Sequence, residues 1–142
     1  MKQEKMIKVL AFGTFDLFHE GHKYYLSESK KLGDILIVDV ARDLTVKKVK
    51  GFLPNENETM RLMKVMASGF ADEVVLGDEI NYYDILKKIS PNIICLGYDQ
   101  TAFIDKLEHE LKKIGLNNTK IVRINSFKPE IYKSSKIREQ KR

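Results

Sequence analysis

The sequence predicts an α/β fold in which one doubly wound, parallel, five-stranded sheet serves the whole chain. Short apolar, β-branched runs alternate along the chain with segments of helical periodicity. Each helical segment is long enough to return the next strand parallel to the one before it. With 142 residues, 43% of them hydrophobic and 32% charged, the chain has the size and composition of one domain, residues 1–142.

Each predicted strand is a short apolar run, as expected for strands buried on both faces of a sheet. In order, these runs are IKVLAF, DILIVDVAR, DEVVLG, NIICLG and KIVRIN. The fourth contains the only cysteine, Cys95, which we expect to be a buried thiol. The strands are predicted at residues 7–12, 34–42, 72–77, 92–97 and 120–125.

Helical spacing of apolar residues, together with end signals, predicts the helices between these strands. Gly33 is expected to cap the first helix, and Met60, Met63 and Met66 are expected to form a core-facing stripe on the second. A glycine and a proline interrupt the basic segment 43–55, which we therefore expect to be a loop. The helices are predicted at residues 22–33, 56–69, 82–90, 101–115 and 131–142.

Charge and cysteine usage narrow the class of partner. The net charge of +5 is concentrated at residues 46–51 and 132–142, and such basic clusters attract polyanions such as a nucleoside triphosphate. Neither cluster interleaves the aromatic residues that stack on bases, so we expect no nucleic-acid partner. The absence of a membrane-length apolar run and the single cysteine together predict a cytoplasmic protein that does not bind membranes.

Two of the three histidines, His19 and His22, lie just after the first strand in the segment GTFDLFHEGHKYYL. A spacing of three places both on one face of an opening helical turn, where backbone N–H groups favour a phosphate. Gly21 removes a side chain where a ligand must approach closely. The alternatives are helix capping and a metal site, for which the sequence offers few further ligands because His109 lies on another predicted helix.

The run GTFDLFHEGH resembles the signature of the nucleotidyltransferase superfamily built on an HxGH motif. This resemblance implies a Rossmann-like fold and direct attack of an acceptor on the α-phosphorus of a nucleoside triphosphate, with pyrophosphate leaving. His19 and His22 would stabilise charge on the phosphate oxygens. The implied nucleotide-binding residues are Gly13, Thr14, Phe15, His19, Glu20, Gly21, His22, Asp99, Phe127, Ser134 and Ser135.

Further matches supply the remaining implied roles. In ARDLTVKKVKG, Lys50 is implied to reach the triphosphate as a catalytic and substrate-binding residue, with Lys47 or Lys48 as substitutes. Asp16 and Arg61 are implied to bind substrate. The structural alternatives are a solvated lysine for Lys50 and a surface helix charge for Arg61.

Two later segments complete the resemblance. LGYDQTAF is similar to the loop that contacts base and ribose, with Asp99 as the polar contact, and main-chain groups near Phe127 are implied to read the base edge. YKSSKIR is similar to the element in which Ser134, also assigned a catalytic role, and Ser135 hold the β- and γ-phosphates. A turn-forming Asp99 and a helix-capping Ser134 are the alternatives.

Within the superfamily, the chain most resembles the archaeal FAD synthases, which move AMP from ATP to FMN; the matching residues are ARD-TV-K-KG and LG-DQT-F. The alternative is a CTP-dependent glycerol-3-phosphate cytidylyltransferase, although that family has an R-T-x-G-I-S-T-T run where this chain has RINSFKPEIYKSS. A nucleotide-binding sensor without turnover is a third hypothesis for the function. The resemblance implies a divalent metal, Mg²⁺, carried with the nucleotide and without dedicated protein ligands, and it leaves a homodimer open.

Overall fold

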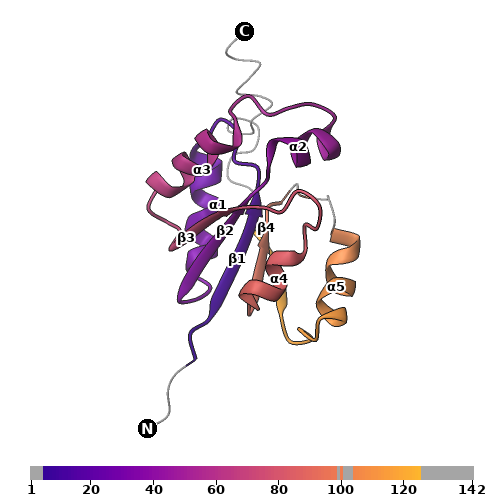
Figure 1. Ribbon diagram of the computed structural model, residues 1–142. Helices are drawn as coiled ribbons and strands as arrows, with labels where there is room; N and C mark the ends of the chain where they lie inside the picture. Colours follow the sequence, from indigo (N-terminus) through magenta and orange to yellow (C-terminus); the bar gives the residue numbers. More distant parts are fainter. Residues whose placement is uncertain (1–4, 99, 101–103, 126–142) are drawn as a thin grey trace.

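The computed structural model describes residues 5–98, 100 and 104–125, and its core is a five-stranded, all-parallel sheet (Figure 1). The spatial order of the strands is β3-β2-β1-β4-β5. This arrangement confirms the predicted α/β fold class. The strands are β1 (Lys8–Gly13), β2 (Ile35–Val40), β3 (Glu73–Leu76), β4 (Ile93–Leu96) and β5 (Lys120–Arg123).

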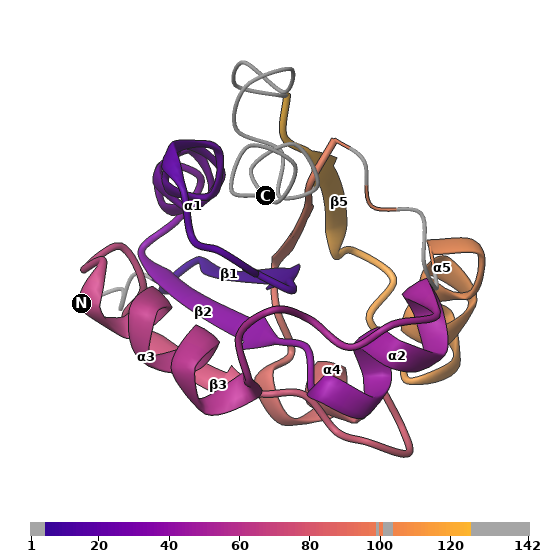
Figure 2. The same ribbon diagram turned by 90° about the horizontal axis from the view of Figure 1, so that it is seen from above.

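Helices cover both faces of the sheet. Seen from above in Figure 2, α1 and α3 lie on one face, whereas α4 and α5 lie on the other, with α2 toward that second face. Because the chain leaves β1 toward β2 and later returns to β4 on the other side of β1, the strand order reverses between β1 and β4. Ligands of doubly wound sheets bind outside the carboxyl ends of the strands at such a point. The helices are α1 (Glu20–Lys30), α2 (Asp43–Lys50), α3 (Glu58–Ala67), α4 (Asp84–Ile89) and α5 (Ile104–Lys113).

The sheet separates two apolar cores, because successive side chains of a strand point to opposite faces. On the α1 and α3 side, the buried core residues are Val9, Ala11, Phe15, Tyr25, Leu26, Leu36, Val38, Val40, Val65, Cys95 and Ile124. On the α4 and α5 side, they are Leu10, Phe12, Ile37, Leu86, Ile94, Leu96, Leu107 and Leu111. The buried Cys95 confirms the prediction for the lone cysteine.

The prediction of a loop over residues 43–55 was wrong for its first part, which forms helix α2. The side chains of Thr45 and Val46 are buried and anchor this helix. Gly51 adopts a left-handed conformation with φ of 86°, and its N–H donates to Lys47 O at 2.8 Å. The glycine that indicated a loop is therefore the C-terminal cap of a helix.

The prediction that methionines form the core stripe of α3 was also wrong. The exposed fractions of Met60, Met63 and Met66 are 46%, 59% and 57%. Arg61 and Val65 are the buried residues of this helix, spaced by four along its inner face. A periodicity of three in the methionines follows the outer side of the helix equally well, so spacing alone did not identify the buried face.

Gly33 is not the predicted helix cap, because α1 ends at Lys30 and its C-cap is the right-handed Lys31. Gly33 instead allows close packing: a Cβ atom there would lie 2.7 Å from Val9 Cγ2 and 2.8 Å from Ile7 O. None of the helices in the described part of the chain is long and apolar enough to cross a membrane.

Candidate active site

His19 and His22 form a reciprocal cap at the start of α1. His19 is the N-cap residue, and its Nδ1 accepts a hydrogen bond from the Gly21 N–H at 3.1 Å. His22 Nδ1 in turn accepts from the His19 N–H at 3.2 Å. This is the geometry of a capping box in which two imidazoles take the places usually held by Ser or Thr and Glu.

The two rings lie against each other and against an aromatic wall. Their centroids are 3.8 Å apart, and the Phe18 ring stacks on His22 with its centroid 5.5 Å away. Phe15 meets His22 edge-on at 5.6 Å. This packing fixes the orientation of both imidazoles.

Burial keeps both imidazoles neutral at physiological pH. It lowers the pKa of His19 to about 4 despite the nearby Glu20 carboxylate. Burial also lowers the pKa of His22 to about 3, with the neighbouring His19 as the next cause. Because both Nδ1 atoms accept hydrogen bonds, each neutral ring carries its proton on Nε2. The pair therefore offers two Nε2–H donors, which suit phosphate oxygens.

A strained loop leads from β1 to these histidines. Phe15 and Leu17 have positive φ angles of 59° and 51°, a conformation that costs free energy in residues other than glycine. Gly13 allows the loop to fold back, because a Cβ atom there would lie 2.7 Å from the Phe15 ring. The Phe15 ring is thereby held in the core beside His22.

Asp16 ties this loop to the segment before α3. Its buried carboxylate accepts from the Asn55 N–H at 2.8 Å, from Asn55 Nδ2 at 3.0 Å and from the Glu56 N–H at 2.9 Å. In the opposite direction, Glu56 Oε1 accepts a hydrogen bond from the Leu17 N–H at 3.0 Å. These four hydrogen bonds hold the strained conformation in place.

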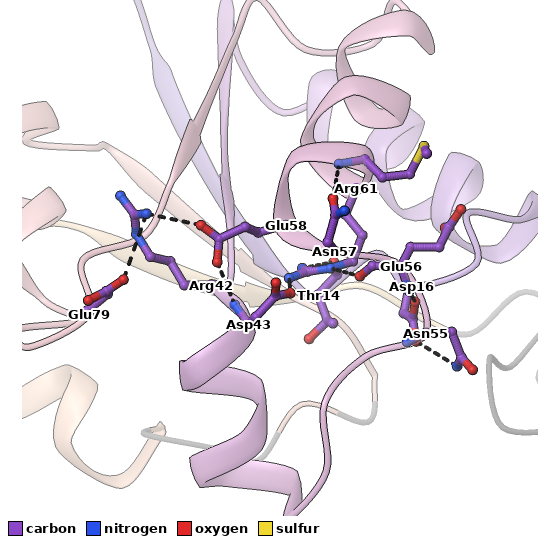
Figure 3. Close-up of polar contacts among 11 residues, drawn as sticks. Thr14, Asp16, Arg42, Asp43, Asn55, Glu56, Asn57, Glu58, Arg61 and Glu79 are labelled. Atoms are coloured by element: carbon purple, nitrogen blue, oxygen red, sulfur yellow. Dashed lines mark hydrogen bonds and ion pairs between the residues drawn. The ribbon is translucent and has the colours of Figure 1, made fainter.

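Arg61 is fully buried and joins three segments (Figure 3). Its guanidinium donates to Glu56 O at 2.9 Å and to Thr14 O at 2.8 Å. A third bond, from Nη2 to Asp43 Oδ1 at 2.8 Å, pairs it with the first turn of α2. The side chain that was predicted to bind substrate thus makes its described contacts with the protein.

Arg42 and Glu58 extend this network, and sequence reasoning missed both residues. Arg42 Nε donates to Gly77 O at 2.7 Å, and its Nη1 donates to Glu58 Oε2 at 3.1 Å. Glu58 Oε1 accepts from the Asp43 N–H at 3.0 Å, which satisfies one of the free N–H groups at the start of α2. The sequence signal was an acidic residue at the start of one helix and an arginine before another, a pattern too common to single out.

The described residues predicted to bind the nucleotide or substrate cluster near the start of α1. Lys50 is the exposed last residue of α2, and it lies close enough to His22 to lower the pKa of that imidazole further. Gly21 lies in the first turn of α1 as a donor to His19, and Glu20 is exposed beside it. Asp99, Phe127, Ser134 and Ser135 lie outside the described residues.

Gln100 was not predicted, although it connects the loop after β4 to the end of β1. Its Nε2 donates to Phe12 O at 3.0 Å, and its Oε1 accepts from the Gly97 N–H at 2.6 Å. Arg123 Nη1 donates to Gly97 O at 2.7 Å and to Gln100 O at 2.8 Å. The signal lies in the motif LGYDQTAF, in which the carboxylate of Asp99, next to this amide, is the predicted polar contact.

A parallel, doubly wound sheet with two neutral imidazole donors at a helix N-terminus defines a class of phosphate-handling α/β proteins. Among residues 5–98, 100 and 104–125, no three His, Cys, Asp or Glu side chains are grouped as metal ligands. The cytidylyltransferase-like family model matches residues 10–140. The chain belongs to the cytidylyltransferase-like family, as its GTFDLFHEGH run had indicated.

Similar proteins refine this placement. An FAD synthase of Methanohalobium evestigatum is 45% identical over 127 residues, which cover 89% of this chain and 82% of the relative. An FAD synthase of Thermoplasma volcanium is 40% identical over 95% of this chain and 94% of its own. A crystal structure titled as a lipopolysaccharide core biosynthesis protein from Thermoplasma volcanium superposes with a TM-score of 0.79 at 41% identity, covering 87% of this chain and 99% of that one.

Proposed function

We propose that this protein is an FMN adenylyltransferase, which transfers AMP from ATP to FMN and releases pyrophosphate. The observation that carries the proposal is the pair of neutral Nε2–H donors at the start of α1, in a chain 40% or more identical to FAD synthases over most of its length. We also propose, from the sequence features, that it acts in the cytoplasm. A homodimer is a further hypothesis, which the molecular mass of the protein in solution would test.

In the proposed reaction, a phosphate oxygen of FMN attacks the α-phosphorus of ATP. The bond from that phosphorus to the oxygen bridging to the β-phosphate breaks, and pyrophosphate leaves with the electron pair. Nε2–H of His19 and Nε2–H of His22 donate to the phosphate oxygens that gain charge. Because both rings are already neutral donors, neither has to gain a proton before the reaction.

The remaining predicted residues are assigned around this centre. We assign Lys50 to the departing pyrophosphate, together with Ser134 and Ser135. Asp99 and the main chain near Phe127 are assigned to the nucleoside. A divalent ion, Mg²⁺, bound to the triphosphate would neutralise part of its charge.

Asp16 and Arg61 are better described as positioning residues than as substrate contacts. Both side chains are buried, at 4% and 0% exposure, and their hydrogen bonds go to the loops around the histidines. Loss of either would release the strained loop that orients His19 and His22. Their effect on the reaction is therefore expected to act through the position of the imidazoles.

The test is pyrophosphate release by the purified protein with Mg²⁺, crossing ATP or CTP with FMN or glycerol 3-phosphate. The proposal expects release with ATP and FMN alone, and FAD as the product. Release only with CTP and glycerol 3-phosphate would replace it with the cytidylyltransferase alternative. Nucleotide binding without release of pyrophosphate under any combination of substrates would support the hypothesis of a nucleotide-binding sensor.

A further inference from the structure

Asp39 is a buried carboxylate near the carboxyl end of β2, an inner strand of the sheet. It is the penultimate residue of β2, in register with Phe12 of β1 and Val75 of β3. Its side chain lies on the same face as Ile37, two residues earlier, within the apolar layer on the α4 side. Only 5% of Asp39 is exposed.

This carboxylate is not compensated by the protein around it. Within the described residues, Asp39 makes no hydrogen bond or ion pair, and the guanidinium of Arg42, which lowers its pKa, is bonded to Gly77 O and Glu58. Burial outweighs Arg42 and raises the pKa of Asp39 to about 7. Gly77 leaves room for Oδ1, because a Cβ atom there would lie 2.8 Å from it. A buried acid without a partner destabilises the fold, which points to a ligand.

Asp39 also lies on the side of the sheet that the proposed nucleotide site leaves open. The triphosphate is assigned to the start of α1, and the nucleoside to the loops after β4 and β5. The carboxyl ends of β2 and β3, where Asp39 and Gly77 meet, remain for the acceptor. An acceptor whose phosphate reaches the histidines can extend its ring over this end of the sheet.

The flavin ring carries chemistry that matches a lone carboxylate. One edge of isoalloxazine is an imide, in which a single N–H lies between two carbonyl groups. A carboxylate accepts that N–H in a charge-assisted hydrogen bond, and a buried one does so without competition from water. Most of the ring is apolar, in keeping with the buried Phe12, which pairs with Asp39 in the sheet, and the buried Ile37, two residues earlier on β2.

We propose that Asp39 binds the imide N–H of the acceptor's flavin ring and selects for flavin over acceptors that lack this group. The proposal rests on the proposed function, since it assumes that FMN is the acceptor. It makes Asp39 a specificity-determining residue on β2, remote in sequence from the HxGH motif.

The test compares binding of FMN and of 3-methyl-FMN, which lacks the imide proton, by quenching of flavin fluorescence. The variants of the full chain are D39V, D39N and the control E73V, which removes an exposed carboxylate at the amino end of β3. D39V is expected to raise the Kd for FMN by about 10- to 100-fold, the loss of a hydrogen bond to a charged group. The wild type should discriminate against 3-methyl-FMN by a similar factor, and D39V should not.

Further readouts separate this role from a structural one. D39N keeps one acceptor oxygen and should bind FMN with a Kd between those of the wild type and D39V. The KM for ATP should stay within about twofold in all variants, and D39V should unfold at no lower urea concentration than the wild type, because valine suits a buried strand. E73V should bind both flavins as the wild type does.

Two outcomes would overturn the inference. Equal Kd values for FMN in the wild type and D39V would remove Asp39 from the site, even if the wild type makes FAD. Equal binding of FMN and 3-methyl-FMN by the wild type would remove the imide contact. A wild type that binds no FMN and makes no FAD would instead overturn the proposed function, and this inference with it.

Discussion

His22 Nδ1 accepts a hydrogen bond from the backbone N–H of His19, 3.2 Å away, while the two imidazole rings stack at a centroid distance of 3.8 Å. This one relationship does two things. It satisfies a free N–H group at the start of α1, and it places the His22 proton on Nε2. Helix capping and phosphate donation, which were competing interpretations of the sequence, are therefore compatible in the same residues.

Replacing His22 by alanine should reduce kcat by about a hundredfold or more, the cost of losing one preorganised donor to the transition state. The loss of its capping bond should also lower the free energy of unfolding by about 1 kcal/mol. Steady-state kinetics and urea unfolding measure the two effects. Lys23→Ala, an exposed change in the same turn, is the control, and a near-normal kcat for His22→Ala would contradict the donor role.

Activity should not follow the titration of an ordinary histidine near pH 6.5. The pKa values of about 4 for His19 and about 3 for His22 keep both rings neutral down to about pH 5. NMR titration of the imidazole carbons should show no protonation of either ring between about pH 5 and pH 8. A midpoint near 6.5 for either ring would contradict the neutral-donor mechanism.

The same shifts determine how stability depends on pH. Each folded-state pKa lies below the ordinary value of 6.5, so the native state binds fewer protons than the unfolded state. The contribution of each histidine to stability is therefore complete above pH 6.5 and is lost as the pH falls toward its folded-state pKa. Urea unfolding of the wild type and His22→Ala at a series of pH values measures this contribution. The difference in their free energy of unfolding should be largest in favour of the wild type above pH 6.5, and it should shrink as the pH falls toward about 3.

Gly13→Ala should displace the Phe15 ring, since the new Cβ atom would lie 2.7 Å from it. We expect a loss of about 1–3 kcal/mol in the free energy of unfolding, typical of overpacking in a core. kcat should fall as well, because Phe15 packs against His22. The double variant Gly13→Ala/Phe15→Leu should recover part of the stability, and no recovery would show that the clash lies elsewhere.

Arg61→Lys should lower both stability and kcat while leaving the charge in place. A lysine ammonium cannot match the planar fork that bonds Thr14 O, Glu56 O and Asp43 together. We expect the variant to lose about 2–4 kcal/mol on urea unfolding, because buried partners are left without donors. Lys87→Ala, on the exposed side of α4, is the control. An Arg61→Lys variant as stable as the wild type would contradict the inference that the Arg61 guanidinium holds these three segments together.

The sequence was sufficient to predict the five-stranded parallel sheet, because strands buried on both faces of a sheet are continuous apolar runs. It was also sufficient to place His19 and His22 together at the start of α1, because they follow β1 at a spacing of three residues. Both predictions depend on local periodicity, which sequence carries directly.

Other features depend on contacts between distant segments. Arg61 was predicted to bind substrate, with a surface helix charge as the alternative, and its full burial was not expected because charged residues are seldom fully buried. Its three hydrogen-bond partners come from three different segments. The exposed methionines of α3 are the reverse case, since the buried Arg61 and Val65 occupy its inner face. The sequence could not single out Asp39 as a candidate site residue. An acidic residue within an apolar strand does not show whether its side chain will be buried or which partners will surround it.

Gln100→Ala should weaken the use of ATP and leave flavin binding unchanged. Its side chain joins the Gly97 N–H to Phe12 O, so its removal frees the loop after β4 from the end of β1. If that loop holds the nucleoside, the KM for ATP should rise by about tenfold. ATP binding would then have to order a loop that the Gln100 hydrogen bonds hold in place in the wild type, at a cost close to that of one hydrogen bond.

The Kd for FMN should remain at the wild-type value in Gln100→Ala, because β2 and β3 lie on the other side of β1 from β4. The matched change is Asp39→Val, which is expected to affect FMN and spare ATP. Steady-state KM values for ATP and fluorescence titrations with FMN measure the two sides separately. If both variants weakened both substrates equally, the carboxyl edge of the sheet would act as one shared site, and the division between nucleotide and acceptor halves would be wrong.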